Sequence, residues 1–217
     1  MVGAFALVGV ARFGGVAAPP PPAEPADPPA LAALALPPDA DFALIDEVLQ
    51  KRAPNLGLTL RRQLGVAIAD EARQAGYDPL LILAIIDVES DFLEDAVSNK
   101  GARGLMQIKP STLYFLAQRE GLKLSREEVA SDPALCVRLG IRYLRWLNDR
   151  FKDLDLTLMA YNAGPARIRQ AMRDRNLEPF RRYPHLVRRD YWRFRRGQGL
   201  EGDWAFALRD EPRLLGR

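Results

Sequence analysis

Residues 78–91 read DPLLILAIIDVESD, and the rest of the chain is interpreted outward from them. Asp78 followed by Pro79 is typical of a helix cap with a proline in the first turn. Residues 80–88 are apolar on nearly every side, which predicts a helix at the centre of a domain. The chain then continues directly into Glu89, so the most buried helix that the sequence predicts ends in a carboxylate.

Helical periodicity continues on both sides of this stretch. Before it, apolar residues recur at helical spacing from Asp41 and again from Leu60 to Gly76. After it, we expect helices over 111–119, from the capping-box pair Ser125 and Glu128, over 133–151 behind Asp132-Pro133, and from Asp155 to Gly164-Pro165. Because no alternating run is long enough for a strand, the predicted fold class is mainly α.

The helix predicted over 133–151 has two contrasting stripes. Its inward stripe is formed by Val137, Ile141, Leu144 and Leu147, and its outward stripe by Arg138, Arg142 and Arg145. The cysteine of this helix, Cys136, is interpreted as a small core residue.

Composition limits the chemistry available to the chain. Among 217 residues there is one cysteine and one histidine, His185, which we interpret as a surface or structural residue. One cysteine excludes an internal disulfide framework and a cysteine-based zinc cluster, and one histidine cannot form a metal triad. Any catalysis must therefore use carboxylates, hydroxyls or amides. Nothing in the sequence implies a metal or an organic cofactor.

The chain divides into four predicted segments. Residues 1–18 are apolar and resemble a degraded or wrongly started export signal, with an ordinary disordered tail as the alternative. Residues 19–40 hold nine of the 17 prolines and predict a disordered Pro/Ala-rich linker. The folded domain is expected over 41–195, and residues 196–217 form a C-terminal tail.

The formal net charge of +3 conceals an uneven distribution. Residues 167–217 hold 14 arginines and no lysine against 7 acids, which gives +7 and leaves −4 for the rest of the chain. Such a basic segment is compatible with nucleic acid, an anionic membrane surface or an anionic polymer as partner. A solvated arginine-rich helix is the alternative without a partner.

Glu89 is the first candidate for chemistry. Burial at the end of an apolar helix raises the pKa of a carboxyl group, and an acid that stays protonated near neutral pH is a general acid. The alternatives are an ion pair with an arginine or a solvent-facing helix end. Nearby Asp91, Glu94 and Asp95 lie in a polar loop and look solvated rather than aimed at a cleft.

Two further segments hold amides and hydroxyls. Residues 98–107 read SNKGARGLMQ, in which two glycines three apart permit a tight turn or a close approach to a ligand, a plain turn being the alternative. The spacing matches no phosphate-binding loop. Residues 160–164 read AYNAG and place Tyr161 beside Asn162 at a helix end, where the pair either caps the helix or orients a sugar or an acid.

Together these segments resemble the soluble lytic transglycosylase family. Glu89-Ser90, Ser98, the Gly104-Leu105-Met106-Gln107 run and the segment 160–164 match that family in order and spacing over about residues 60–190. The resemblance implies a lysozyme-like, mainly helical domain whose cleft binds the glycan strands of peptidoglycan. It also implies export to the periplasm or cell envelope, where the N-terminal segment would lie near a membrane or the wall.

The resemblance also assigns roles to individual residues. Glu89 matches the single acid/base, which protonates the glycosidic oxygen between N-acetylmuramic acid and N-acetylglucosamine and then deprotonates the muramyl C6 hydroxyl, leaving a 1,6-anhydromuramyl end. The substrate-binding positions that match are Ser98, Met106 on the cleft floor, Gln107, Tyr161, Asn162 and Tyr183. Lys109 departs from the family, which often has an apolar residue before Pro110; it either enters the cleft or, as we expect, faces water.

Three other interpretations stay open at the level of sequence. A goose-type-like muramidase would hydrolyse the same bond, and a non-catalytic module of the same fold would only bind peptidoglycan. A nucleic-acid binder would use the arginines beside Tyr191, Trp192 and Phe194, but no nucleic-acid motif accompanies them, so nucleic acid is not the expected partner. The oligomeric state is not predicted.

Overall fold

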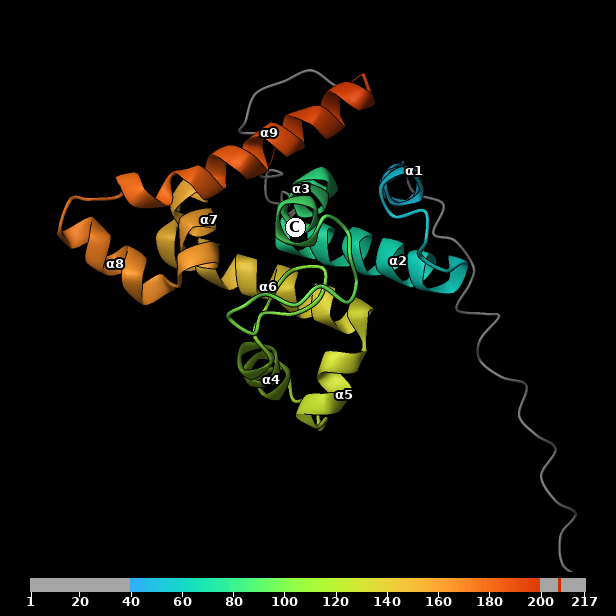
Figure 1. Cartoon of the computed structure of the whole chain (residues 1–217), viewed down its shortest axis with the longest axis horizontal. Helices are drawn as coiled ribbons and strands as arrows, with labels where there is room; N and C mark the ends of the chain where they lie inside the picture. Colours follow the sequence, from blue (N-terminus) through green and yellow to red (C-terminus); the bar gives the residue numbers. More distant parts are fainter. Residues whose placement is uncertain (1–39, 200–206, 208–217) are drawn as a thin grey trace, which may run out of the picture. The chain divides into compact units, whose positions relative to one another are not determined.

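The computed structural model describes residues 40–199 and Ala207 (Figure 1). The export signal expected over 1–18 lies outside the described residues. So do residues 19–39 of the expected linker and residues 200–206 and 208–217 of the expected tail.

The described residues are mainly helical, which confirms the predicted fold class. The helices are α1 Ala40–Arg52, α2 Leu58–Ala75, α3 Pro79–Ser90, α4 Pro110–Arg119, α5 Arg126–Ser131, α6 Pro133–Phe151, α7 Leu154–Ala163, α8 Pro165–Arg173, the 3-10 helix η2 Glu178–Phe180, and α9 Arg182–Gly197. Between α3 and α4, two isolated bridges pair Val97 with Arg103 and Arg103 with Ile108, and no named strand occurs in the described part of the chain.

Helix α3 lies in the core, as the sequence predicts. Every side chain from Leu80 to Ile86 is fully buried, and the Asp78 carboxylate caps the helix by accepting from the Leu80 N–H at 2.9 Å. Figure 1 shows α3 near the middle of the described helices, with α9 crossing it and α2 beside it. The polar end of α3 therefore emerges from the core at Glu89 and Ser90.

Helix α9 explains much of the basic C-terminal charge. Its inward face contains Tyr183, Val187, Tyr191 and Phe194, and these side chains pack against the core of the domain. On the same helix, arginines pair with acids of other helices or of α9 itself: Arg188 with Asp155, Arg189 with Asp190, Arg193 with Asp87 and Arg195 with Asp78. Four arginines of α9 are therefore paired with carboxylates, while Arg182 and Arg196 are exposed, as the solvated-helix interpretation expects.

The arginine stripe predicted on α6 is outward, but two of its members also have partners on neighbouring elements. Arg138 is exposed, but Arg142 donates to both carboxylate oxygens of buried Glu71 at 2.6 and 2.8 Å and to Glu120 at 2.7 Å. Arg145 donates to the Ala75 carbonyl at 2.8 Å. Long arginine stems reach across the contact between α6 and α2, so position on the helix alone did not predict their direction.

Helix α7 starts one residue before the predicted Asp155 and ends at Gly164-Pro165, as predicted. Helix α7 begins at Leu154 behind the cap Asp153, and Gly164, at φ 92°, ends it while Pro165 opens α8.

Within the described residues, none of the helices combines the length and apolar character needed to cross a membrane.

Candidate active site

Glu89 stands where α3 leaves the core, and its neighbour Ser90 fixes that end of the helix. The buried Ser90 hydroxyl lies 3.1 Å from the Ile86 carbonyl oxygen and 3.0 Å from that of Leu105, two acceptors for its one proton. The contact with Leu105 ties α3 to the loop that runs to α4. Ser90 is therefore a positioning residue, and it belongs to the ordered surroundings of Glu89.

Tyr183 of α9 reaches the same carboxyl group. Its hydroxyl donates to Glu89 Oε1 at 2.6 Å, and its side chain is 7% exposed. Burial raises the pKa of Glu89 to about 7, while the hydrogen bond from Tyr183 lowers it. Burial and the charge of Glu89 raise the pKa of Tyr183 well above its usual value, so the phenol stays protonated as a donor.

Tyr161 of α7 lies next to Tyr183. The two rings are nearly parallel, with centroids 6.5 Å apart and planes at 17°. The Tyr161 hydroxyl donates to the Met106 carbonyl oxygen at 2.8 Å, which holds the loop between α3 and α4 against α7. Burial, followed by the charge of Glu89, raises the pKa of Tyr161 well above its usual value. The structure thus brings Glu89, Tyr183 and Tyr161 together.

Gln107 and Ser98 shape the loop beside these residues. The Gln107 amide donates to the carbonyl oxygens of Ala96 and Gly104, both at 2.9 Å, and Gln107 itself adopts a positive φ of 46°. The Ser98 Oγ accepts from the backbone N–H of Ala102 at 3.0 Å. Both side chains therefore hold the loop. Any contact with sugar would use the donors and acceptors of Ser98 and Gln107 that these hydrogen bonds do not occupy.

Met106 requires a correction to the expected cleft floor. Its side chain is only 2% exposed, so it lies beneath the surface rather than on it. A Cβ placed on Gly140 of α6 would come within 2.6 Å of the Met106 sulfur, so that glycine lets the helix approach the loop closely. In this structure, the buried side chain of Met106 supports the loop from beneath, and its carbonyl oxygen accepts a hydrogen bond from Tyr161.

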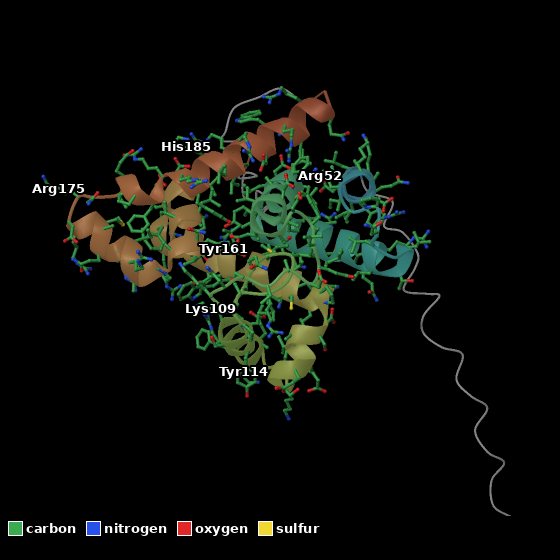
Figure 2. The ribbon with its side chains drawn as sticks, in the orientation of Figure 1. Arg52, Lys109, Tyr114, Tyr161, Arg175 and His185 are labelled. Carbon is green, nitrogen blue, oxygen red and sulfur yellow. The ribbon has the colours of Figure 1, made fainter. Side chains whose placement is uncertain are left out.

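Asn162 and Lys109 lie at the surface. Asn162 is exposed in the last turn of α7, next to Tyr161, with its amide open to solvent. Lys109 is exposed ahead of α4, and Figure 2 shows it on the α4 side of Tyr161. Exposure fits both alternatives for Lys109, entry into the cleft and contact with water.

The acidic residues after Glu89 face solvent, as expected. Asp91, Glu94 and Asp95 are exposed, and Asp91 pairs with Arg52 of α1 at 2.6 Å. Asp87 is buried, but it pairs with Arg52 and Arg193. These contacts leave Glu89 as the acid that the two site tyrosines surround, a setting suited to proton transfer by one carboxyl group.

Sequence reasoning missed part of this arrangement. In the sequence, Ser90 stands out only as the neighbour of Glu89, although a serine at the end of a buried helix is a candidate for a hydrogen bond to a nearby loop. Tyr143 of α6 was not singled out, yet its ring lies 5.8 Å from that of Tyr161 and 5.7 Å from that of Trp146. No sequence signal links Tyr143 to Tyr161, because these two rings come from different helices. Tyr143 and Trp146 are three positions apart on α6, which places their rings on one face of that helix.

Comparisons with known proteins agree with this geometry. A family model described as Transglycosylase SLT domain matches residues 67–183. Membrane-bound lytic murein transglycosylase C of Shigella sonnei is 33% identical over 137 residues, which is 58% of this chain and 38% of that protein. A putative soluble lytic murein transglycosylase of Haemophilus influenzae is 34% identical over 87 residues, 40% of this chain and 15% of that protein.

A solved structure is similar as well. An inactive mutant of the lytic transglycosylase Slt from Pseudomonas aeruginosa superposes with a TM-score of 0.55 at 28% identity, over 67% of this chain and 26% of that chain. This chain therefore spans well under half of the length of the relatives named here.

Proposed function

We propose, from the premise that this chain belongs to the transglycosylase SLT domain family, that it is a peptidoglycan lytic transglycosylase. It would cleave the β-1,4 bond between N-acetylmuramic acid and N-acetylglucosamine and leave 1,6-anhydromuramyl ends. The observation that carries the proposal is the carboxyl group of Glu89, half-buried, with a pKa raised to about 7 and a hydrogen bond from Tyr183.

The proposed reaction uses one carboxyl group twice. Protonated Glu89 gives its proton to the glycosidic oxygen as the bond from that oxygen to the muramyl anomeric carbon breaks. The resulting carboxylate is stabilised by the hydroxyl of Tyr183 at 2.6 Å. It then takes the proton of the muramyl C6 hydroxyl, whose oxygen bonds to the anomeric carbon. Glu89 ends protonated again, and no water is consumed.

The remaining site residues would bind and orient the glycan. The exposed amide of Asn162 suits an N-acetyl group, which offers one acceptor and one donor. Ser98 and Gln107 would contact sugar from the loop that they hold, and Tyr161 would keep that loop against α7. Met106 supports the loop from beneath.

A module that only binds glycan is less compatible with this site. Placing a carboxyl group where burial opposes its ionisation weakens folding at neutral pH, and binding alone does not require such a group. Peptidoglycan as substrate also implies export, so we propose a periplasmic or cell-envelope location.

Digestion of purified sacculi tests the proposal. Wild-type protein should release muropeptides whose mass spectra show anhydro ends, and Glu89→Gln should release none. Asp95→Asn removes an exposed acid near Glu89 in sequence and serves as the matched control, with activity within about twofold of wild type. Reducing ends in place of anhydro ends would assign the chain to the hydrolytic muramidases instead.

A further inference from the structure

The arginines between positions 167 and 195 fall into two groups that differ in how their charge is balanced. Those at 188, 189, 193 and 195 each have an acidic partner. The segment 165–182 differs, since it holds six exposed arginines against two acids and so has a net charge of +4. We call these six the arginine surface: Arg167, Arg169, Arg173, Arg175, Arg181 and Arg182.

Only a small part of this charge is balanced locally. Within the described residues, one ion pair is formed inside the segment, from Arg181 to Glu178 at 2.9 Å, with both side chains more than half exposed. Arg167 lies over the Phe180 ring, 5.5 Å from its centroid, which leaves its charge unneutralised. The arginine surface therefore offers guanidinium groups that carboxylates of a ligand can reach.

A surface cavity of about 400 Å³ opens within the arginine surface. Its walls combine three kinds of chemistry: the guanidinium groups of Arg175 and Arg181, the polar side chains of Asn176 and Glu178, and the apolar side chains of Met172 and Leu177. Met172 is 43% exposed although it is apolar. This combination suits a ligand that has carboxylates, amides and methyl groups within a short length.

The chain connects this surface to the candidate active site at both ends. Asn162 lies three residues before Pro165, the first residue of α8, and Tyr183 directly follows Arg182, the last arginine of the segment. Figure 2 shows Arg175 at the far end of α8, well away from Tyr161. A ligand group held near Arg175 would therefore lie away from the bond that is cut.

We infer that the arginine surface binds the acidic stem peptides that branch from the glycan strand. The inference rests on the proposed function, because stem peptides are present only if the substrate is peptidoglycan. A stem peptide carries free carboxylates, backbone amides and alanyl methyl groups, which are the groups that the cavity walls complement. An anionic lipid surface fits less well, since a layer of headgroups would meet the exposed arginines but would not fill a cavity walled by Met172, Asn176 and Leu177.

The expected effect is moderate because the arginines are exposed. A solvent-exposed guanidinium–carboxylate pair changes an equilibrium constant by roughly threefold, so two pairs together give about tenfold. The effect should also fall with added salt, which screens exposed charges.

Binding measured without turnover tests the inference. In full-length protein carrying Glu89→Gln, calorimetry would compare a glycan tetrasaccharide with its stem peptides and the same tetrasaccharide after an amidase has removed them. The test variant adds Arg175→Gln and Arg181→Gln, which line the cavity. The matched control adds Lys123→Gln and Arg138→Gln instead, which remove the same charge from exposed positions elsewhere.

The expected result is specific to the peptides. The test variant should raise the Kd for the stem-bearing glycan about tenfold and leave the Kd for the bare glycan within about twofold, while the control changes neither. Equal affinity of the starting protein for both ligands would overturn the inference, as would an equal loss for both in the test variant. The inference would also be overturned if the test variant lost binding to phosphatidylglycerol vesicles but kept its preference for the stem-bearing glycan. That result would assign the arginine surface to a membrane.

The proposed function is judged by a different measurement. Protein with Glu89 intact either cleaves the bare glycan or does not, and that result does not involve the arginine surface. Stem preference without any cleavage would therefore refute the transglycosylase proposal and leave the inference standing.

Discussion

Removing the hydroxyl of Tyr183 changes one contact of Glu89 and little else. Tyr183→Phe keeps the buried ring and its stacking on Tyr161, but deletes the donor that lies 2.6 Å from Glu89 Oε1. Burial, which raises the pKa of Glu89 to about 7, then acts without the opposing hydrogen bond. The pKa of Glu89 should rise further.

The size of the shift follows from the strength of that bond. A hydrogen bond to a charged group contributes about 1.5–3 kcal/mol, and about 1.4 kcal/mol corresponds to one pKa unit. The pKa of Glu89 should therefore increase by about one to two units in the variant. The carboxylate formed during cleavage also loses its stabilising donor, so the maximal rate should fall about tenfold or more.

The pH dependence of kcat/KM on soluble glycan strands measures this shift. The reaction begins with protonated Glu89, so activity is lost as pH rises through the pKa of that group, near pH 7 in the wild type. In Tyr183→Phe the midpoint of that loss should move to about pH 8–9.

Tyr161→Phe is the matched control. It removes an equally buried tyrosine hydroxyl that donates to the Met106 carbonyl rather than to Glu89. Its alkaline midpoint should stay near that of the wild type. An unchanged or lower midpoint in Tyr183→Phe, or the same shift in both variants, would refute the proposed acid.

Three further predictions concern stability. The folded pKa of Glu89, about 7, lies above its ordinary 4.5, so the contribution of Glu89 to stability is present at low pH and lost as pH rises through about 7. In urea unfolding, Glu89→Gln should therefore increase the free energy of unfolding by about 2 kcal/mol more at pH 8 than at pH 5. An equal increase at both pH values would contradict the burial argument. Arg195→Met leaves the buried carboxylate of Asp78 with one donor fewer and should lower the free energy of unfolding by about 3 kcal/mol in the same assay. Adding Asp78→Asn should restore part of this stability, and no recovery would exclude the unpaired charge as the cause. Gly140→Ala places a Cβ against the Met106 sulfur and should lower the free energy of unfolding by about 1–3 kcal/mol. Met106→Ala in the same chain should relieve the clash, and strictly additive losses of stability would show that the two residues do not interact.

Local signals account for the parts of the fold that the sequence predicted. Asp78 with Pro79 and Asp132 with Pro133 mark helix starts through groups that act on their own neighbours, and the structure has helices at both places. Ser125 and Glu128 form the capping box that their spacing predicts. The buried helix ending at Glu89 follows from composition alone, because a segment that is apolar on all sides has to be covered.

Contacts between distant segments account for what was not predicted. Tyr183 and Glu89 are 94 positions apart, and only the crossing of α9 over α3 brings them together. The partners of Arg142 and Arg193 depend in the same way on which helices pack side by side. The family resemblance implies that Met106 lines the cleft floor, whereas its side chain is buried and packs closely against Gly140 of α6. Pairing and burial across helices are properties of the assembled core, which no local pattern specifies.

The most direct test of the central claim is a digestion of sacculi in water labelled with the heavy oxygen isotope. If Glu89 alone serves as acid and then as base toward the muramyl C6 hydroxyl, the new muramyl ends are anhydro ends and contain no heavy oxygen, and Glu89→Gln forms no new ends. Heavy oxygen on reducing muramyl ends would show that water is the nucleophile and would contradict the account.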